Sequence, residues 1–264
     1  MGLSKLFKSS KKGQSNHISD ALIHEIATQR GNVDNLYPSD FTAQEIDQIQ
    51  QVRPYTMTSL ERLVTLYRSI DYINQNVIEG DYAECGVWKG GGMMLIANKL
   101  LSLGISDKKL FLFDTFEGMS EPTNVDRSFD NKDASVLLHK ETNKEEGNNI
   151  WCYSSLEEVK NNLSKTGYDL NNIKFIKGKV EETLPYDEID KLALLRLDTD
   201  WYESTKHELE TLYDKLVVGG VLIIDDYGHW SGSKKAVDEF IKNRKLNLFL
   251  NRVDYTCRLA IKMS

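Results

Sequence analysis

Two pairs of aspartates follow hydrophobic runs in the sequence. Asp198 and Asp200 come after the run LALLRL, and Asp225 and Asp226 come after the run VLII. Clustered carboxylates repel one another unless a cation holds them or some of them stay protonated. A ligand set made only of oxygen selects a hard ion, with Mg²⁺ first and Mn²⁺ or Ca²⁺ as alternatives. The two pairs therefore predict a divalent-cation site, provided that the two strand ends lie side by side.

The geometry of a strand limits what each pair can do. In an extended chain Asp198 and Asp200 project to the same side. Asp225 and Asp226 project to opposite faces, so both reach one ion only if the chain bends there, and Gly228 eases such a bend. Taken singly, each aspartate has a simpler interpretation as a solvated turn acid or, for Asp200, as the N-cap of the next helix.

A glycine-rich segment, ECGVWKGGG, predicts a ligand-binding turn between a strand and a helix. A dinucleotide-binding G-x-G-x-x-G turn needs glycine where this chain has Trp88, and a large side chain there hinders a pyrophosphate. A turn with Glu84 just before Gly86 suits a ligand that carries positive charge and no diphosphate, such as S-adenosylmethionine. Asp114, which ends the next strand, is then placed to accept hydrogen bonds from the ribose hydroxyls. The alternative is that the glycines only allow tight packing and that Asp114 is an exposed turn acid.

Hydrophobic patterns predict the elements that must position these residues. The expected strands are 81–87, 109–114, 172–178, 192–198, 221–225, 246–254 and 256–263. The expected helices are 58–77, with a capping box of Thr58 and Glu61, then 89–103, 154–166, 203–216 and 232–243. Alternation of this kind is typical of a doubly wound α/β fold with a mostly parallel sheet and helices on both faces. The last two strands leave no room for a helix between them, so we expect an antiparallel pair.

One α/β domain accounts for most of the chain. We expect a flexible tail over 1–17, a helical cap or lid over 18–55, and the catalytic domain over 56–264 with a loop insertion over the site at 117–150. In such folds ligands bind beyond the carboxyl ends of the strands, near the switch in strand order. The acids and the glycine-rich turn should therefore meet at one edge of the sheet.

Composition narrows the class of protein. The 264 residues have a formal net charge of −7 with charges of both signs interspersed, which argues against a nucleic-acid partner. The three cysteines are far apart and show no CxxC spacing, which argues against a disulfide framework or a zinc site. No apolar run approaches the roughly 18 residues of a membrane span, and the first residues lack an apolar segment of secretory length. We expect a cytoplasmic enzyme.

Several segments are similar to the macrocin O-methyltransferase (TylF-like) family of S-adenosylmethionine- and Mg²⁺-dependent sugar O-methyltransferases. They are RPYTMTSLERL, YAECGVWKGG, LFDTFEGM, LLRLDTDWYEST and GGVLIIDDYGHWSGSKKAVDEF, and together they span about residues 53–262. The resemblance implies a Rossmann-like class I methyltransferase fold with a seven-stranded sheet and a homo-oligomer, commonly a dimer. It also implies that Asp198, Asp225 and Asp226 bind the metal and that Asp200 is the general base. The cofactor site would be lined by Glu84, Gly86, Trp88, Gly90, Asp114, Thr115, Phe116, Gly178, Val180 and Glu181.

The chemistry so implied is methyl transfer from S-adenosylmethionine to a hydroxyl group. Mg²⁺ would lower the pKa of the hydroxyl as a Lewis acid, and Asp200 would take the proton. The expected acceptor is a vicinal diol on a sugar or polyol, with a catechol ring as the alternative. His229 is a rival base, because a histidine titrates near neutrality, or it is a hydrogen-bond donor behind the site.

Other classes of protein stay open. The sequence DTD resembles the D-x-D of nucleotide-sugar glycosyltransferases, but no Arg/Lys cluster is expected around Asp198 to bind a diphosphate. It also resembles the D-x-D of haloacid-dehalogenase-like phosphatases, which have Thr or Val where this chain has Tyr202. An inactive binding module would have no need of Asp200 together with a full set of metal carboxylates.

Overall fold

The computed structural model describes residues 37–140, 143–144 and 149–263. The helices are α2 (Ala43–Val52), α3 (Leu60–Gln75), α4 (Gly91–Ser102), α5 (Ala134–Lys140), α6 (Leu156–Ser164), α7 (Val180–Thr183), α8 (Tyr202–Leu212) and α9 (Ser231–Arg244). The strands are β1 (Asp81–Cys85), β2 (Leu110–Asp114), β3 (Ile173–Lys177), β4 (Leu192–Leu197), β5 (Leu216–Ile224), β6 (Asn251–Arg252) and β7 (Arg258–Ile261). All of these elements belong to the unit Thr42–Ser264.

The described residues form a seven-stranded sheet with the order β3-β2-β1-β4-β5-β7-β6. The first five strands in this order pair in parallel, and β7 pairs antiparallel with both β5 and β6. The predicted doubly wound fold and the antiparallel pair at its end are confirmed. The chain runs outward from β1 to β3 and then returns to β4 on the other side of β1. This switch in strand order opens a crevice between β1 and β4.

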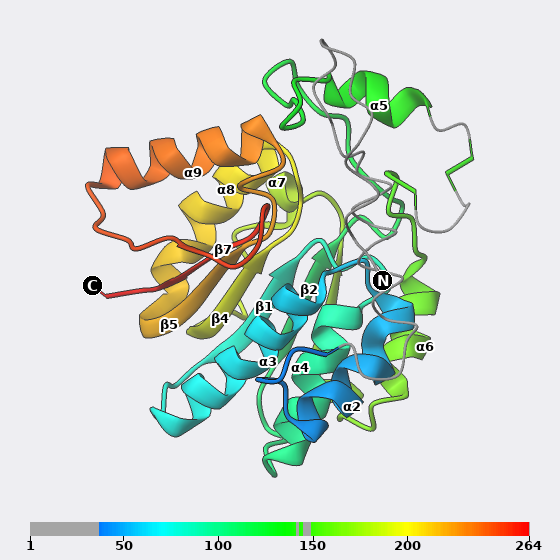
Figure 1. The fold of residues 1–264 in the computed structure, drawn as a ribbon, viewed down its shortest axis with the longest axis vertical. Helices are drawn as coiled ribbons and strands as arrows, with labels where there is room; N and C mark the ends of the chain where they lie inside the picture. Colours follow the sequence, from blue (N-terminus) through cyan, green and yellow to red (C-terminus); the bar gives the residue numbers. More distant parts are fainter. Residues whose placement is uncertain (1–36, 141–142, 145–148, 264) are drawn as a thin grey trace, which may run out of the picture. The chain divides into compact units, whose positions relative to one another are not determined.

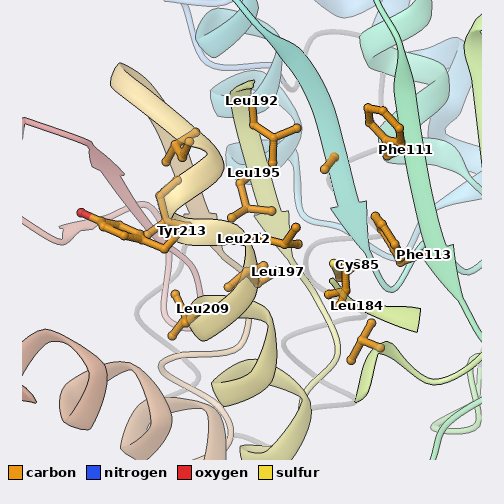
Figure 2. Packing of buried hydrophobic residues seen from close by; sticks show 14 of the residues in the cluster. Cys85, Phe111, Phe113, Leu184, Leu192, Leu195, Leu197, Leu209, Leu212 and Tyr213 are labelled. Atoms are coloured by element: carbon orange, nitrogen blue, oxygen red, sulfur yellow. The ribbon is translucent and has the colours of Figure 1, made fainter. Parts of the chain in front are cut away.

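Helices cover both faces of the sheet (Figure 1). On one face α7, α8 and α9 lie together, and on the other α3 packs against α4, with α2 and α6 beside them. All six residues of β4 are buried because the strand is covered on both sides. In Figure 2, Leu197 at the end of β4 lies toward Leu209 and Leu212 of α8. This packing fixes the end of β4, from which the chain continues to Asp198.

Helix α3 differs from its prediction at both ends. Its N-cap is Ser59, whose hydroxyl accepts the N–H of Arg62, so the expected capping box of Thr58 and Glu61 is wrong. The helix ends at Gln75, and Val77, expected on the buried face, is 82% exposed in the turn that follows.

The C-terminal strands also differ in length from their predictions. Strand β5 begins at Leu216, five residues before the expected start, and runs through Gly219 and Gly220. The expected strand 246–254 pairs only at Asn251–Arg252, because the alternating leucines before it pack against the core instead of pairing with β7. Alternation there reflects burial and not hydrogen bonding between strands.

The two segments predicted outside the sheet are described in part. The tail 1–17 and the first part of the lid, through residue 36, lie outside the described residues. The end of the lid forms α2, with a capping box of Thr42 and Glu45, and α2 packs against α4. The insertion 117–150, expected to be a loop, contains α5. Among the described helices none combines the length and apolar character that a membrane crossing needs.

Candidate active site

A cavity opens at the carboxyl ends of β1, β2, β3, β4 and β5. Its lining includes the residues predicted to bind a cofactor or an ion at positions Gly86, Trp88, Asp114, Thr115, Gly178, Val180, Glu181, Asp198, Asp200, Asp225 and Asp226. The wall also includes Thr58, which precedes α3, Arg62 in the first turn of α3, and Cys152 beyond the insertion. The tertiary structure therefore brings the glycine-rich turn and both aspartate pairs to one place.

Three aspartates converge at the end of β4 and β5. Asp198, Asp225 and Asp226 each offer a carboxylate oxygen, and these oxygens lie within 4.8 Å of one another. Asp226 Oδ2 is buried and has no hydrogen-bond partner among the described residues. A donor set of carboxylate oxygens with one oxygen left unsatisfied fits a hard divalent cation such as Mg²⁺.

Asp200 lies beside this cluster in a backbone conformation that the sequence did not predict. Its φ of +66° is in the left-handed region, so Asp198 and Asp200 are not part of an extended chain. The indole N–H of Trp230 donates to Asp200 Oδ1 at 2.6 Å. Burial, followed by the negative charge of Asp198, raises the pKa of Asp200 to about 7. A carboxylate with such a pKa can exchange a proton near neutral pH.

Two arginines lie against the cluster. Arg196, buried in β4, contacts Asp198 at 2.7 Å and Asp225 at 2.9 Å, and it also pairs with Glu84. Arg62 of α3 pairs with Asp225 and lies 3.1 Å from Asp254. The expectation that no basic cluster surrounds Asp198 is wrong. Both guanidinium groups are engaged by carboxylates, however, so they act as internal counter-ions.

The arginines divide the acids into two electrostatic classes. Burial acts to raise the pKa of Asp225, but Arg196 and Arg62 outweigh it and hold that pKa below its usual range. Burial and the charges of Asp200 and Asp225 raise the pKa of Asp226 well above its usual range. Burial likewise raises the pKa of Asp198, against the opposing charge of Arg196. The adjacent residues Asp225 and Asp226 thus differ, because the surroundings of Asp225 favour its charged form and those of Asp226 favour its protonated form.

The bend after β5 does not depend on glycine in the way the sequence suggested. Gly228 is not among the residues of positive φ. A Cβ at this position would lie 1.9 Å from the backbone oxygen of Tyr255. Glycine is required at Gly228 because the turn between β6 and β7 passes against it. That contact holds the chain after Asp226 close to the C-terminal hairpin.

Asp114 and the glycine-rich turn support each other. The Asp114 carboxylate accepts the backbone N–H groups of Val87 at 2.7 Å, of Trp88 at 3.2 Å and of Phe116 at 2.7 Å. Gly86 has φ +81°, and a Cβ there would lie 2.0 Å from the backbone oxygen of Asp198. The turn after β1 can therefore approach the end of β4 only with glycine at this position.

Three residues predicted to line the cofactor site lie behind the cavity wall. Glu84 is 1% exposed and pairs with Arg196 under α4. Gly90 is the N-cap of α4, with φ +85°, and contacts Leu163 of α6. Phe116 is buried, with φ +52°. Their positions support the turns that line the cavity.

His229 lies beside the site and not in the lining of the cavity. Its ring Nδ1 is 3.0 Å from the hydroxyl of Tyr255, and its backbone N–H donates to the backbone oxygen of Asp226. The side chain of Asp200 is the one that faces the cluster of three aspartates, whereas the ring of His229 packs against those of Phe129 and Tyr255.

Residues 120–134 of the insertion are joined to this side of the site. The Asp126 carboxylate, fully buried, accepts the backbone N–H of Tyr202 at 2.8 Å and thereby caps α8. Asp200, the N-cap expected from the sequence, does not cap it. The indole N–H of Trp201 donates to the backbone oxygen of Ser120 at 2.9 Å. Loop and helix ends therefore form one wall.

Arg62, Arg196 and Asp126 were not predicted. Arg196 carried a usable signal, because a single charged residue interrupts a hydrophobic strand two positions before Asp198 and must point to the same side. Arg62 and Asp126 carried none, since each is one of many charged residues in a helix or a polar loop. Their partners lie 163 and 76 residues away along the chain.

Comparison with known proteins gives one family for nearly the whole chain. The family described as macrocin-O-methyltransferase (TylF) matches residues 6–260. Demethyldecarbamoylnovobiocin O-methyltransferase of Streptomyces niveus is 35% identical over 188 residues, which are 70% of this chain and 67% of that protein. A rhamnosyl-tetracenomycin-C 4'-O-methyltransferase of Streptomyces olivaceus is 34% identical over 173 residues, 66% of this chain and 62% of that protein. Mycinamicin III 3''-O-methyltransferase of Micromonospora griseorubida is 30% identical over 173 residues, 66% of this chain and 65% of that protein. The matches thus span about two thirds of these relatives.

Solved structures agree on the fold. The O-methyltransferase NovP superimposes with a TM-score of 0.70 at 30% identity, covering 80% of this chain and 83% of that one. The calicheamicin methyltransferase CalS11 superimposes with a TM-score of 0.62 at 17% identity, covering 96% and 98%. The predicted class I methyltransferase fold is confirmed.

Proposed function

Because the chain belongs to the macrocin O-methyltransferase (TylF) family, we propose that it transfers a methyl group from S-adenosylmethionine to a hydroxyl group of a small molecule, with Mg²⁺ bound at Asp198, Asp225 and Asp226. The observation that supports this most directly is the convergence of these three acids beside Asp200 in the wall of a cavity that the glycine-rich turn also lines. An acid cluster with a separate proton acceptor suits activation of a hydroxyl group.

The methyl donor would occupy the part of the cavity between Gly86, Asp114 and the segment 178–181. The backbone of Gly86 approaches the end of β4 there, so the donor's sulfonium would lie near the acids. Both oxygens of Asp114 already accept backbone N–H groups. A carboxylate oxygen accepts more than one hydrogen bond, so the proposed contact with the ribose hydroxyls adds to this role.

Neighbouring side chains suit the proposed metal ligands to this role. Arg196 and Arg62 keep Asp225 charged, and Asp226 supplies the unsatisfied oxygen. When bound, Mg²⁺ would supply Lewis acidity to the acceptor's hydroxyl groups. An ion that binds both the reacting hydroxyl and a neighbouring hydroxyl would favour a vicinal diol as the acceptor.

Asp200 would accept the proton of the reacting hydroxyl. The Trp230 indole N–H donates to its carboxylate and fixes the orientation of the group. The hydroxyl oxygen then forms a bond to the methyl carbon as the carbon–sulfur bond breaks, which leaves S-adenosylhomocysteine. His229 stays the alternative base, and its ring lies farther back, against Tyr255.

The acceptor we propose is a sugar of a natural product or a surface polysaccharide. Two relatives are named for methylation at numbered sugar-type positions, 4'-O and 3''-O. The segment 18–55 would act as a lid that selects the acceptor. A catechol acceptor is the second candidate, and no contact among the described residues of the site favours a nucleotide-sugar glycosyltransferase. A homodimer and a cytoplasmic location stay predictions.

Calorimetric titration with S-adenosylmethionine, with and without Mg²⁺, tests the cofactors, and a screen of vicinal diols follows it. Asp198→Ala should abolish Mg²⁺-dependent release of S-adenosylhomocysteine while S-adenosylmethionine still binds. The exposed Asp190→Asn is the control. If Asp198→Ala methylates a diol at the rate of the unmodified protein, the metal site is wrong.

A further inference from the structure

A buried acid behind the cavity wall has no role in the site described so far. Glu208 of α8 is fully buried. Its Oε1 accepts the hydroxyl of Thr199 at 2.9 Å, while its Oε2 is buried without a hydrogen-bond partner among the described residues. A buried oxygen without a partner costs free energy, so an apolar side chain of similar size would serve the fold as well or better. The acid at this position therefore requires an explanation other than stability.

Thr199 lies between Asp198 and Asp200 and lines the cavity. Besides the hydrogen bond from its hydroxyl to α8, its backbone oxygen accepts the N–H of Trp201 at 2.7 Å, which keeps the chain in a tight turn. Its Cγ2 methyl lies 3.4 Å from the point that a Cβ at Gly86 would occupy. Thr199 is thus fixed between the turn after β1 and the start of α8.

The conformation of Asp200 explains why Thr199 has to be held. Asp200 has a φ of +66°, in the left-handed region, where a residue with a Cβ stays only if its surroundings fix it. The indole N–H of Trp230 holds its side chain at 2.6 Å. Its backbone continues directly from Thr199. If Thr199 moved, Asp200 could relax toward a more common conformation, and the carboxylates of Asp198 and Asp200 would no longer be directed to the same place.

Helix α8 is a fixed element from which Glu208 can act. Asp126 caps its start by accepting the backbone N–H of its first residue at 2.8 Å. Leu209 and Leu212 pack in the core, as Figure 2 shows. The hydrogen bond between Glu208 and Thr199 therefore joins a short loop to a helix that is held at its start and along its length.

We propose that Glu208 is a positioning residue that acts through Thr199. Its hydrogen bond with the Thr199 hydroxyl holds the segment 198–200 in the conformation in which Asp198 can bind the ion and Asp200 can accept the proton. Glu208 is not among the residues that line the cavity. This proposal rests on the proposed function for the tasks of Asp198 and Asp200, and it adds the residue that keeps both acids directed to one place.

Hydrogen exchange of the Trp230 indole N–H, measured by NMR on the full chain without a metal ion, reports on Asp200. The signal is assigned by its absence in Trp230→Phe. Glu208→Met removes the acceptor of the Thr199 hydroxyl, so exchange should become roughly 2- to 10-fold faster, the factor for one lost hydrogen bond. Glu208→Gln keeps an acceptor oxygen at the same place and should exchange like the unmodified protein. Burial raises the pKa of Glu208 well above its usual range, so the amide is a close match for the acid.

Stability separates positioning from a general structural role. Glu208→Met removes a buried oxygen that has no partner among the described residues, so the midpoint of thermal unfolding should stay the same or rise. Tyr213→Phe is the matched control, because Tyr213 follows α8 and its hydroxyl is buried in the same way. It should leave the Trp230 exchange unchanged. A lower midpoint in Glu208→Met, with faster exchange at every indole N–H, would leave Glu208 only a structural role.

Affinity for a divalent cation gives a second readout. Mn²⁺ binding is measured by electron paramagnetic resonance, and Mg²⁺ binding by calorimetry, on the full chain. Glu208→Met should bind each ion about 10-fold more weakly, as is typical when a group behind a metal ligand is lost. Glu208→Gln and Tyr213→Phe should keep the affinity of the unmodified protein.

Substitutions at Thr199 test the route by which Glu208 acts. Thr199→Val keeps the branched shape and removes the hydroxyl, so it should reproduce both effects of Glu208→Met. Thr199→Ser keeps the hydroxyl and should reproduce neither. The double variant should lose no more than either single variant, because both substitutions remove the same hydrogen bond. Additive losses, or unchanged exchange and affinity in Thr199→Val, would overturn the proposal.

The two readouts separate this proposal from the proposed function. If the unmodified protein binds no divalent cation but the Trp230 exchange depends on Glu208 and Thr199, the positioning role stands and the metal site is rejected. If Mg²⁺ binds and all variants share one affinity and one exchange rate, the positioning role is rejected and the metal site stands.

Discussion

Asp225 and Asp226 are neighbours in the chain, yet they belong to two different sides of the site. Asp225 faces α3 and is neutralised by Arg62 and Arg196. Asp226 faces Asp200 and the wall formed by the insertion, where an oxygen of its own has no partner among the described residues. We call these the arginine side and the aromatic side.

The difference assigns separate tasks to chemically identical residues. On the arginine side, permanent counter-ions keep a carboxylate charged and fixed whether or not an ion is bound. On the aromatic side, burial without a counter-ion leaves carboxyl groups whose charge depends on what else is bound. In a site of this kind, the arginine side keeps its charge and position, and the aromatic side changes its charge when a ligand binds.

The largest expected effect is on the aromatic side. Asp200→Asn keeps the shape of the side chain and removes the proposed proton acceptor, so kcat should fall by about 10²- to 10⁴-fold while the affinity for S-adenosylmethionine stays the same. Release of S-adenosylhomocysteine measures kcat, and calorimetry measures affinity. A greater loss in His229→Gln than in Asp200→Asn would reverse the assignment of the base.

The arginine side should respond in stability before activity. Arg196→Met leaves three buried or partly buried acids without their shared cation, and the free energy of unfolding should fall by about 3–5 kcal/mol. Urea denaturation measures it. Arg62→Met should cost less, because Arg62 touches two acids and is more exposed. Equal stability of Arg196→Met and the unmodified protein would contradict the counter-ion role.

Amide substitutions at the adjacent aspartates should change stability in opposite directions when no divalent ion is present. Asp225→Asn removes the negative charge that two guanidinium groups share and one of its two acceptor oxygens, so it should lower the free energy of unfolding by about 1–3 kcal/mol. Asp226→Asn should raise it, since burial among other acids disfavours the charged carboxylate at this position. Thermal unfolding at pH 7 with a chelator compares the two variants.

The pH dependence of these variants has opposite signs as well. A folded-state pKa that is lowered, as for Asp225, stabilises the fold above the unfolded pKa and loses this contribution as the pH falls. A raised pKa, as for Asp226, makes the metal-free fold less stable as the pH rises above the usual aspartate range. Mg²⁺ should reverse the second trend. Parallel pH profiles for Asp225→Asn and Asp226→Asn would remove the distinction between the two sides.

The smallest expected effect concerns the anchor of the insertion. Asp126→Ala removes the cap of α8 and should lower the free energy of unfolding by about 0.5–2 kcal/mol. Ser155→Ala removes the cap of α6, on the other face of the sheet, and should cost a similar amount. Only Asp126→Ala should also raise the KM for a glycoside acceptor. The same KM in both variants would show that the anchor does not shape the acceptor site.

The sequence by itself determined the order of strands and helices, the gathering of acids and glycines at one edge of the sheet, and the family. These follow from local patterns. Hydrophobic residues alternate in strands and recur every three to four residues in helices, and each pattern stops where a turn begins. A cluster of Asp198, Asp200, Asp225 and Asp226 could be predicted because strand ends in a parallel sheet must meet. Only the resemblance to the family singled out three of them as metal ligands. Alternating leucines can reflect pairing in a strand or packing against the core. At residues 246–250 the cause is packing against the core, so the prediction of a strand there was wrong.

Only the tertiary structure decided how the acids differ from one another. Arg62 lies 163 residues from Asp225, and Asp126 lies 76 residues from the helix that it caps. The pKa of a carboxyl group depends on burial and on charges within a few ångströms, and neither follows from neighbours in the chain. Identical residues in one short sequence can therefore become a fixed charge and a responsive one, and only the packing of distant segments determines which is which.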